Sequence, residues 1–177
     1  MRSRLRSLPR EVLNAGVEIR QFAENDWPAV WKIVHAVIEA ADTYEYPPGS
    51  TEAQGRALWI QPPPGECWVA VEGRQVLGTY KIGPNRLGLA NHVANGSYMV
   101  SADAQGRGLG RALCEHSLAR ARELGFAAMQ FNAVVSTNTR ALKLWRSLGF
   151  IIVGTVPNGF RLSGRDMVDY HILHRFL

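Results

Sequence analysis

Three glycines alternate with other residues at positions 106, 108 and 110, between an expected strand and the clearest helix of the chain. Glycine adopts backbone conformations that other residues avoid, so a loop of this kind can turn tightly and direct several N–H groups to one point. That point lies at the N-terminus of the helix, where the helix dipole favours an anion. The loop therefore predicts a site for a phosphate-bearing ligand, built from a strand, a turn and a helix.

The residues around the glycines narrow the choice of ligand. A P-loop would end in Gly-Lys followed by Ser or Thr, and this loop does not. A dinucleotide-binding fingerprint would need a third glycine at position 111, where Arg111 stands. What remains is the pattern Gln105-x-x-Gly108-x-Gly110, followed by Arg111 at the start of the helix.

A second pattern follows, in which Asn138 precedes Ala141, Leu144-Trp145 and Leu148-Gly149-Phe150. It begins 28 residues after Gly110, which leaves room for one helix and one strand. The two patterns, in this order and at this spacing, resemble the two signatures of the GNAT superfamily of N-acetyltransferases. The similarity covers about residues 17 to 175 and is strongest from 92 to 155.

Hydrophobic periodicity and turn residues predict the secondary structure. Helices are predicted after residues 24–26, over 50–60, over 109–124 and after Thr137 or Asn138. Strands are predicted at 17–22, 67–71, 76–82, 92–100, 127–135, 150–155 and 167–173. This order indicates an α/β fold with a mixed sheet. The GNAT resemblance implies a mostly antiparallel sheet of six to seven strands, splayed between the fourth and the fifth, with helices on both faces.

The positive charge is concentrated at the start of the chain. The net charge is +5, with 20 basic and 15 acidic residues, and the first ten residues contain four arginines, Arg2, Arg4, Arg6 and Arg10. Without these four, 16 basic residues face 15 acidic ones, so the body is nearly neutral. It also lacks the interleaved basic and aromatic residues of a nucleic-acid platform. We expect a flexible basic leader over residues 1–15 and a single GNAT domain over 16–177.

Composition also bears on location and partners. No apolar run approaches the roughly 20 residues that span a bilayer. Cys67 and Cys114 have no metal-ligand spacing and are expected to be buried free thiols of a reducing compartment. We expect a cytoplasmic protein that binds a small-molecule amine, with no metal, no membrane and no nucleic-acid partner. A homodimer is compatible with the sequence.

The resemblance implies acetyl-CoA as the acetyl donor. In the superfamily the pantetheine arm lies between the splayed strands like an extra strand, and the pyrophosphate lies on the glycine loop. The matching cofactor-binding residues are Tyr98, Met99, Val100, Gln105, Gly106, Arg107, Gly108, Leu109, Gly110, Arg111, Asn138 and Trp145. Two alternatives stay open. Arg107 and Arg111 are only solvent-exposed residues at the start of a helix, and Asn138 is only a helix cap.

Two groups that many superfamily members use in catalysis are missing from their usual places. Trp145 stands where many members carry a tyrosine thought to protonate the leaving sulfur, and an indole N–H is a poor acid. Trp145 is then a wall of the cofactor tunnel or part of the core. Neither of the two splayed strands carries a glutamate, and their one titratable base is His92, at a strand end where histidines are more often structural. The general base is therefore undetermined.

Each splayed strand carries an asparagine instead, Asn95 and Asn132. A polar side chain inside an apolar strand costs about 1–3 kcal/mol unless it is paired. Neighbouring strands could bring both amides to one spot, where they would donate to a carboxylate or carbonyl and accept from an amine. The alternative is a hydrogen-bonded bulge or strand end. The surrounding residues resemble the branch of proline-analogue (azetidine-2-carboxylate) acetyltransferases, in which these asparagines serve substrate binding and catalysis.

Tyr44 and Tyr46 follow the first helix, where superfamily members build the acceptor pocket. We expect their rings to line the site of a small substrate, the alternative being an ordinary loop with packed tyrosines. The predicted function is direct transfer of the acetyl group of acetyl-CoA to a small, amino-acid-like amine in a ternary complex. A protein acetyltransferase acting on an N-terminus or a lysine would need an open peptide groove. The other alternative is a non-catalytic CoA-binding regulatory module.

Overall fold

The chain is described by a computed structural model over residues 11–13, 16–162 and 166–177. The predicted basic leader and its four arginines lie outside the described residues, except for a short strand at Glu11–Leu13. This strand pairs with Val17–Gln21, so the described sheet begins before residue 16, where the sequence analysis placed the domain boundary.

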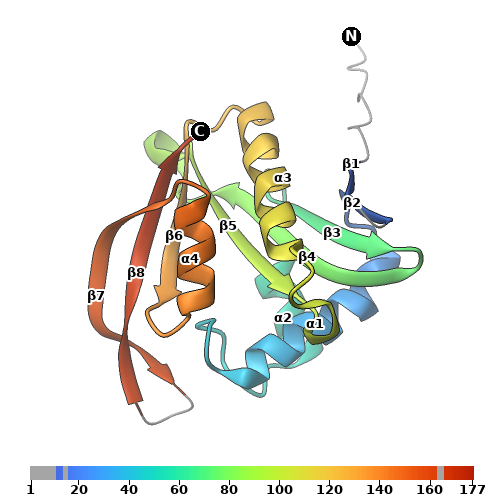
Figure 1. Ribbon diagram of the computed structural model, residues 1–177, viewed down its shortest axis with the longest axis horizontal. Helices are drawn as coiled ribbons and strands as arrows, with labels where there is room; N and C mark the ends of the chain where they lie inside the picture. The colour runs from blue at the N-terminus through green and yellow to red at the C-terminus, as the bar shows by residue number, and fades with distance from the viewer. Residues whose placement is uncertain (1–10, 14–15, 163–165) are drawn as a thin grey trace.

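The described residues form one sheet of eight strands, in the order β1-β2-β3-β4-β5-β6-β8-β7 (Figure 1). The strands are β1 (Glu11–Leu13), β2 (Val17–Gln21), β3 (Glu66–Glu72), β4 (Gln75–Pro84), β5 (Val93–Val100), β6 (Ala128–Val135), β7 (Ile151–Leu162) and β8 (Asp166–Phe176). Neighbouring strands are antiparallel except β5 and β6, which are parallel. The mixed, mostly antiparallel sheet is confirmed. It exceeds the predicted six to seven strands because β1 extends the edge beside β2.

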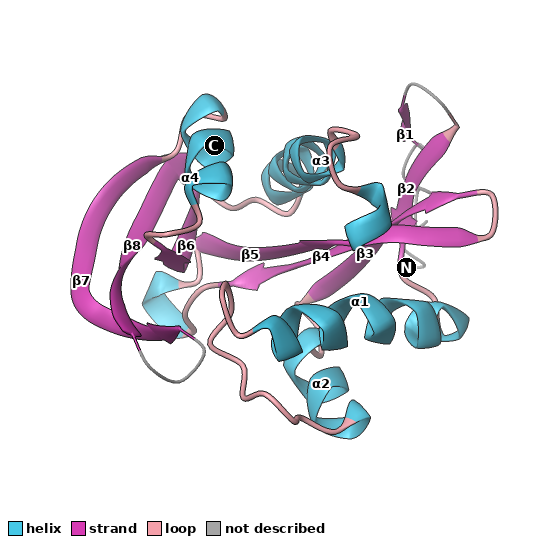
Figure 2. Ribbon diagram, turned by 60° about the horizontal axis from the view of Figure 1, so that its bottom comes forward, coloured by secondary structure: helices cyan, strands magenta, loops and turns pink. Residues whose placement is uncertain are grey.

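In the part of the chain that the structure describes, four α-helices cover the two faces of this sheet. They are α1 (Trp27–Ala40), α2 (Glu52–Trp59), α3 (Leu109–Glu123) and α4 (Thr139–Ser147). Figure 2 shows α1 and α2 on one face and α3 and α4 on the other, as predicted. The second half of the site depends on α4, whose first turn is capped by Asn138: its Oδ1 accepts the N–H of Ala141 at 3.1 Å.

Two cores, one on each face, result from the alternation of side chains along the strands. In β3, Cys67, Val69 and Val71 pack with residues of α1 and α2, whereas Trp68 and Ala70 belong to the core that contains α3 and α4. All five side chains are buried, which explains the unbroken apolar run in the sequence. The central strands are therefore packed from both sides and form a fixed base for the site.

β5 and β6 separate after three residue pairs. The parallel ladder consists of Val93 with Ala128, Ala94 with Met129, and Asn95 with Gln130. β5 continues to Val100 and β6 to Val135 beyond this ladder, and β6 goes on pairing with β8. These are the fourth and fifth strands of the sequence-based count, so the predicted splay between them is confirmed.

β7 and β8 are both longer than predicted. We expected strands at 150–155 and 167–173. In the structure β7 runs on through Pro157-Asn158-Gly159, a sequence typical of a turn, and its register with β8 shifts there. Asn158 adopts a positive φ of 51° and donates its N–H to Asp169 Oδ1 at 2.9 Å. The turn residues therefore form an irregularity inside a continuous hairpin.

We predict that Gly55→Ala destabilises the fold. Alanine is favoured over glycine inside a helix by roughly 1 kcal/mol, but a Cβ at Gly55 would lie 2.1 Å from Trp31 Cζ3. Overpacking of this kind costs about 1–3 kcal/mol, so packing outweighs propensity and the free energy of unfolding falls. Urea unfolding measures it. Ala53→Ser, at an exposed position of the same helix, is the control; a gain in stability for Gly55→Ala would contradict the packing.

Candidate active site

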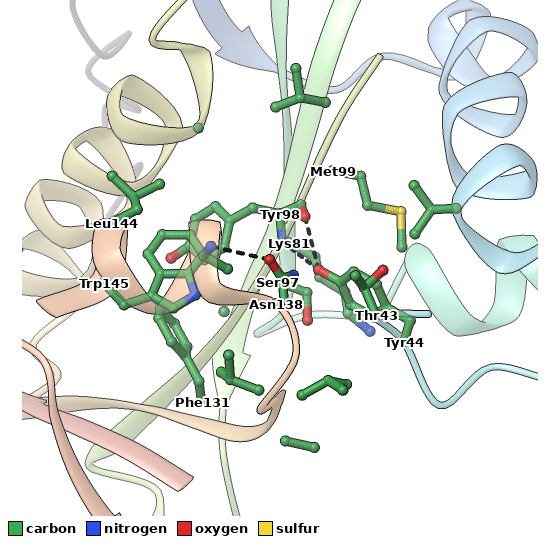
Figure 3. A pocket seen from close by; sticks show the side chains of 18 of the residues that line it. Thr43, Tyr44, Lys81, Ser97, Tyr98, Met99, Phe131, Asn138, Leu144 and Trp145 are labelled. Carbon is green, nitrogen blue, oxygen red and sulfur yellow. Dashed lines mark hydrogen bonds between the residues drawn. The ribbon is translucent and has the colours of Figure 1, made fainter. Parts of the chain in front are cut away.

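A cavity of about 750 Å³ lies where β5 and β6 separate. Its walls come from the loop after α1, the end of α2, β4, β5, the glycine loop, β6 and α4 (Figure 3). Apart from Arg107, every predicted site residue lines it: Tyr44, Tyr46, Asn95, Tyr98, Met99, Val100, Gln105, Gly106, Gly108, Leu109, Gly110, Arg111, Asn132, Asn138 and Trp145. The splay therefore brings the two sequence patterns to one place.

The glycine loop requires glycine for two different reasons. Gly106 and Gly108 have φ angles of 81° and 78°, a region that favours glycine, and a Cβ on either would meet no atom within 4 Å. Gly108 is also the N-cap of α3, so open space lies over the N-terminus of that helix. Gly110 allows close packing instead, since its Cβ would lie 3.4 Å from Leu144 Cδ2 on α4.

The arginines near this loop have different surroundings. Arg107 does not line the cavity; its guanidinium pairs with Glu72 at 2.6 Å and holds the pKa of that carboxyl below its usual value. Arg111 lines the cavity and donates to Ser147 Oγ at 2.6 Å, which links α3 to α4. Arg140, which the sequence analysis missed, lines it too and donates to Gln105 Oε1 at 3.0 Å. Arg111 and Arg140 are therefore the arginines near the loop that line the cavity.

The edge of β5 that faces the gap presents its even-numbered peptide groups. Asn85 N donates to Val93 O at 2.7 Å, and Ser101 N donates to Leu77 O at 2.9 Å. In an antiparallel ladder these bonds recur at every second residue, so odd-numbered β5 residues bond to β4. The N–H and C=O of Tyr98 consequently face the gap. The backbone of Met99, a predicted cofactor-binding residue, faces β4, and only its side chain lines the cavity.

Tyr44 occupies part of this edge. Its hydroxyl donates to Tyr98 O and accepts the Tyr98 N–H, both at 2.9 Å (Figure 3). The ring stacks on Tyr46, with centroids 5.4 Å apart, and burial raises the pKa of both phenols, that of Tyr46 to about 12. Tyr44 therefore stays a neutral phenol that can donate and accept at the same time. This contact joins the loop after α1 to the open strand.

The two asparagines lie in one cavity, but each is already hydrogen-bonded. Asn95 Nδ2 donates to Gln130 O at 2.9 Å, across the last pair of the parallel ladder. Asn132 Nδ2 donates to Asn85 Oδ1 at 2.7 Å, and its Oδ1 accepts from Gln130 Nε2 at 2.9 Å. Within the described part of the chain, Asn95 Oδ1 has no protein donor. The carbonyl oxygen of Asn95 is therefore available to a ligand, and each Nδ2 has used one of its two N–H donors in these bonds.

Trp145 is both cavity wall and core, which joins the two alternatives left open by the sequence. It is 9% exposed and packs against Phe131 and Tyr98, with ring centroids 5.0 and 5.2 Å away (Figure 3). The two alternatives for Asn138 are also compatible, because the residue caps α4 and lines the cavity at the same time.

Among the titratable groups, the two cysteines are buried free thiols as predicted, whereas one lysine of the cavity wall was not singled out. His92 is exposed and does not line the cavity. Cys67 and Cys114 are buried free thiols, and burial raises their pKa to about 11 and about 12. Lys81, which the sequence analysis did not single out, is 8% exposed and lines the cavity. A lysine inside the apolar strand 76–82 was the available signal.

The described residues contain no group of three His, Cys, Asp or Glu side chains that could hold a metal ion. Among the helices of the described segments, none has the length and apolar character that crossing a bilayer requires.

This chain resembles known acetyltransferases. The model of the acetyltransferase (GNAT) family matches residues 31–150. The N-acetyltransferase aca1 of Schizosaccharomyces pombe is 36% identical over 98 residues, 55% of this chain and 47% of aca1, so the match spans about half of that relative. A GNAT-type acetyltransferase structure from Kribbella flavida is 45% identical, with a TM-score of 0.87, and covers 92% of this chain and 98% of its own.

A phosphinothricin acetyltransferase from Sinorhizobium meliloti, solved in complex with acetyl-CoA, has the same fold. Its TM-score is 0.80 at 24% identity, over 92% of this chain and 89% of its own. The family model spans more than half of the chain, and the Kribbella flavida protein matches nearly all of it. This chain therefore belongs to the GNAT family of acetyltransferases.

Proposed function

We propose that this chain transfers the acetyl group of acetyl-CoA, the donor that GNAT acetyltransferases use, to the amine of a small, amino-acid-like molecule. The amine attacks directly in a ternary complex. One observation carries the proposal: the same cavity is lined by the glycine loop and by Asn95 and Asn132. A phosphate-bearing donor and a polar acceptor can therefore meet at the splay.

The residues present fit acetyl-CoA in two places. The open space over Gly106 and Gly108 at the N-terminus of α3 suits a pyrophosphate, with Arg111 and Arg140 beside it. The even-numbered peptides of β5, at Tyr98 and beyond, can hold pantetheine amides as a neighbouring strand would. Bound there, acetyl-CoA supplies a thioester, which is an acetyl group activated for attack by an amine.

The chain contributes mainly by positioning the reactants. Holding two reactants side by side can lower a barrier by several kcal/mol. The Tyr98 N–H, once Tyr44 no longer occupies it, can donate to a carbonyl oxygen and stabilise the charge that develops there. A thiol with a pKa near ~8.5 can leave as thiolate, so the absence of an acid at Trp145 does not prevent the reaction. The aromatic wall of Trp145 and Phe131 limits access of water.

The acceptor side supports a small polar amine. Asn95 Oδ1 can accept a hydrogen bond from the attacking amine, and the stacked Tyr44 and Tyr46 enclose the space around it. Asn132 is held in place by Asn85 and Gln130. A proline analogue such as azetidine-2-carboxylate fits this description. The presence of both asparagines in the cavity supports the proline-analogue acetyltransferase branch of the family for this chain.

Thiol release from acetyl-CoA tests the proposal. We expect release with a subset of amino acids or proline analogues when these are screened together with polyamines and peptides. Release with peptides alone would instead make the chain a protein acetyltransferase. Acetyl-CoA binding without release with any amine would make it a binding module.

The glycine loop gives a prediction for cofactor affinity. Gly108→Val places a branched side chain in the open space over α3, and we expect acetyl-CoA to bind at least tenfold more weakly in calorimetry. Gly125→Val is the matched control, because Gly125 has a φ of 82° at the opposite end of α3 and also has no neighbour within 4 Å. Both variants carry the same backbone strain. Equal affinities in the two variants would refute the assignment of the loop.

The asparagines give a prediction for catalysis. Asn95→Ala and Asn132→Ala should each lower kcat/KM for the acceptor about three- to tenfold, because Asn95 loses the carbonyl that accepts from the amine and Asn132 loses the second N–H of its amide, hydrogen bonds worth about 0.5–1.5 kcal/mol each. The Kd of acetyl-CoA should change by less than about threefold. Steady-state kinetics separates a loss in KM from a loss in kcat. Asn91→Ala, at an exposed position before β5, is the control; full activity of either folded variant would make that asparagine structural.

Tyr44 gives a prediction of the opposite sign. Tyr44→Phe removes the hydroxyl that occupies the Tyr98 peptide, so a cofactor no longer has to displace two hydrogen bonds of about 0.5–1.5 kcal/mol each. Two such bonds amount to about 1–3 kcal/mol, so we expect acetyl-CoA to bind at least about fivefold more tightly in calorimetry. Tyr46→Phe, which leaves the Tyr98 peptide untouched, is the control. An unchanged Kd for Tyr44→Phe would mean that the hydroxyl stays on Tyr98 in the complex.

A further inference from the structure

Lys81 is a buried cation in the wall of the cavity. It lies on β4 and is 8% exposed. Its Nζ donates to Leu58 O at 2.7 Å and lies 5.7 Å from the ring centroid of Tyr46 and 5.5 Å from that of Trp59. One carbonyl oxygen and two aromatic faces therefore surround the ammonium.

These partners leave the charge of Lys81 unneutralised. Among the residues that the structure describes, no carboxylate forms an ion pair with it. Glu45, whose charge favours the ammonium, is exposed in the same cavity wall. Burial in turn lowers the pKa of Lys81. An ammonium has three N–H donors and Leu58 uses one, so two remain for a ligand.

A purely structural role explains only part of this arrangement. Leu58 is in the last turn of α2, and a cation at a helix C-terminus is stabilising. Such a cation works from the protein surface, where it keeps its hydration. Lys81 is instead almost fully buried, and removal of an ammonium from water is costly unless a counter-charge compensates. A lysine that only capped α2 would have no reason to line the cavity.

Lys81 lies on the same face of the sheet as the predicted amine site. In the β4–β5 register, Lys81 pairs with Ser97 and Gly83 pairs with Asn95. Side chains two residues apart on a strand point to the same face, so Lys81, Ser97 and Asn95 share the α1–α2 face. The backbone positions of Lys81 and Asn95 are therefore two residue pairs apart along the sheet, about 7 Å. A molecule with an amine and a carboxylate on neighbouring atoms could contact both.

We infer that Lys81 binds the carboxylate of the acceptor and so restricts acetylation to amines that carry an anionic group close to the nitrogen. The inference rests on the proposed function and adds the residue that distinguishes an amino acid from a simple amine. Lys81 donates to the carboxylate, and Asn95 Oδ1 accepts from the amine. The substrate class is α-amino acids, including cyclic ones.

Matched pairs of acceptors test the inference. Wild-type protein is assayed with azetidine-2-carboxylate, methionine and other amino acids that release thiol, each against its carboxamide. Because a carboxamide makes the neighbouring amine less basic, more of the amide is neutral and reactive at pH 7. Preference for the free acid must then come from the protein, and we expect it to be at least tenfold in kcat/KM.

Lys81→Met should remove this preference. We expect kcat/KM for the free acids to fall about ten- to a hundredfold, mainly through KM, while the amides change by less than threefold and the Kd of acetyl-CoA is unaltered. Lys143→Met, at an exposed position of α4, removes the same charge and is the control. If Lys81→Met does not fold, Lys81→Gln keeps a hydrogen-bond donor to Leu58 O without the charge and should show the same loss.

The outcomes separate the inference from the proposed function. Equal turnover of acids and amides by wild-type protein would overturn the role of Lys81 and leave acetyl transfer intact. No turnover of any amine would overturn the proposed function. In that case the melting temperature decides about Lys81: cyclobutanecarboxylate, but not its carboxamide, should raise it in wild-type protein and not in Lys81→Gln. No carboxylate-specific rise would overturn the anion site as well.

Discussion

The separation of β5 from β6 after Asn95 is the constraint on which the rest of the molecule depends. Asn95 Nδ2 donates to Gln130 O at 2.9 Å, so a side chain reinforces the last pair of the parallel ladder. Beyond that pair β6 remains with β8, and Phe131 stacks on Phe150 with centroids 4.3 Å apart. The gap is thus maintained by packing on the β6 side, which leaves β5 free to present its edge.

Successive side chains of β5 point to opposite faces of the sheet, so the cavity has one wall on each face. Tyr98 packs with the core of α3 and α4, whereas Met99 packs with that of α1 and α2. The glycine loop leads into α3, whereas Lys81 and the loop after α1, which carries Tyr44 and Tyr46, belong to the opposite face. In the proposed reaction the donor and the acceptor therefore approach from opposite sides of one sheet and need no common entrance.

Local patterns predicted more of this structure than distant contacts did. The glycine loop, the cap at Asn138 and the splay follow from short sequence patterns and their resemblance to a family. Contacts between residues far apart in sequence were not predictable: Tyr44 and Tyr98 are 54 positions apart, and no pattern pairs them. Lys81 was missed because a strand lysine is ordinarily exposed. Arg107 was misplaced because position in the loop does not reveal that Glu72 holds it.

Tyr44 also has a consequence for the behaviour of the chain in solution. A strand with unpaired N–H and C=O groups is a template on which a strand of another molecule can form, and β5 has such groups within its own sheet. The Tyr44 phenol bonds both groups of Tyr98 and so shields the middle of that edge. A slot shaped for a strand-like ligand is thereby protected from foreign strands, and resistance to aggregation depends on the same side chain as access to the slot.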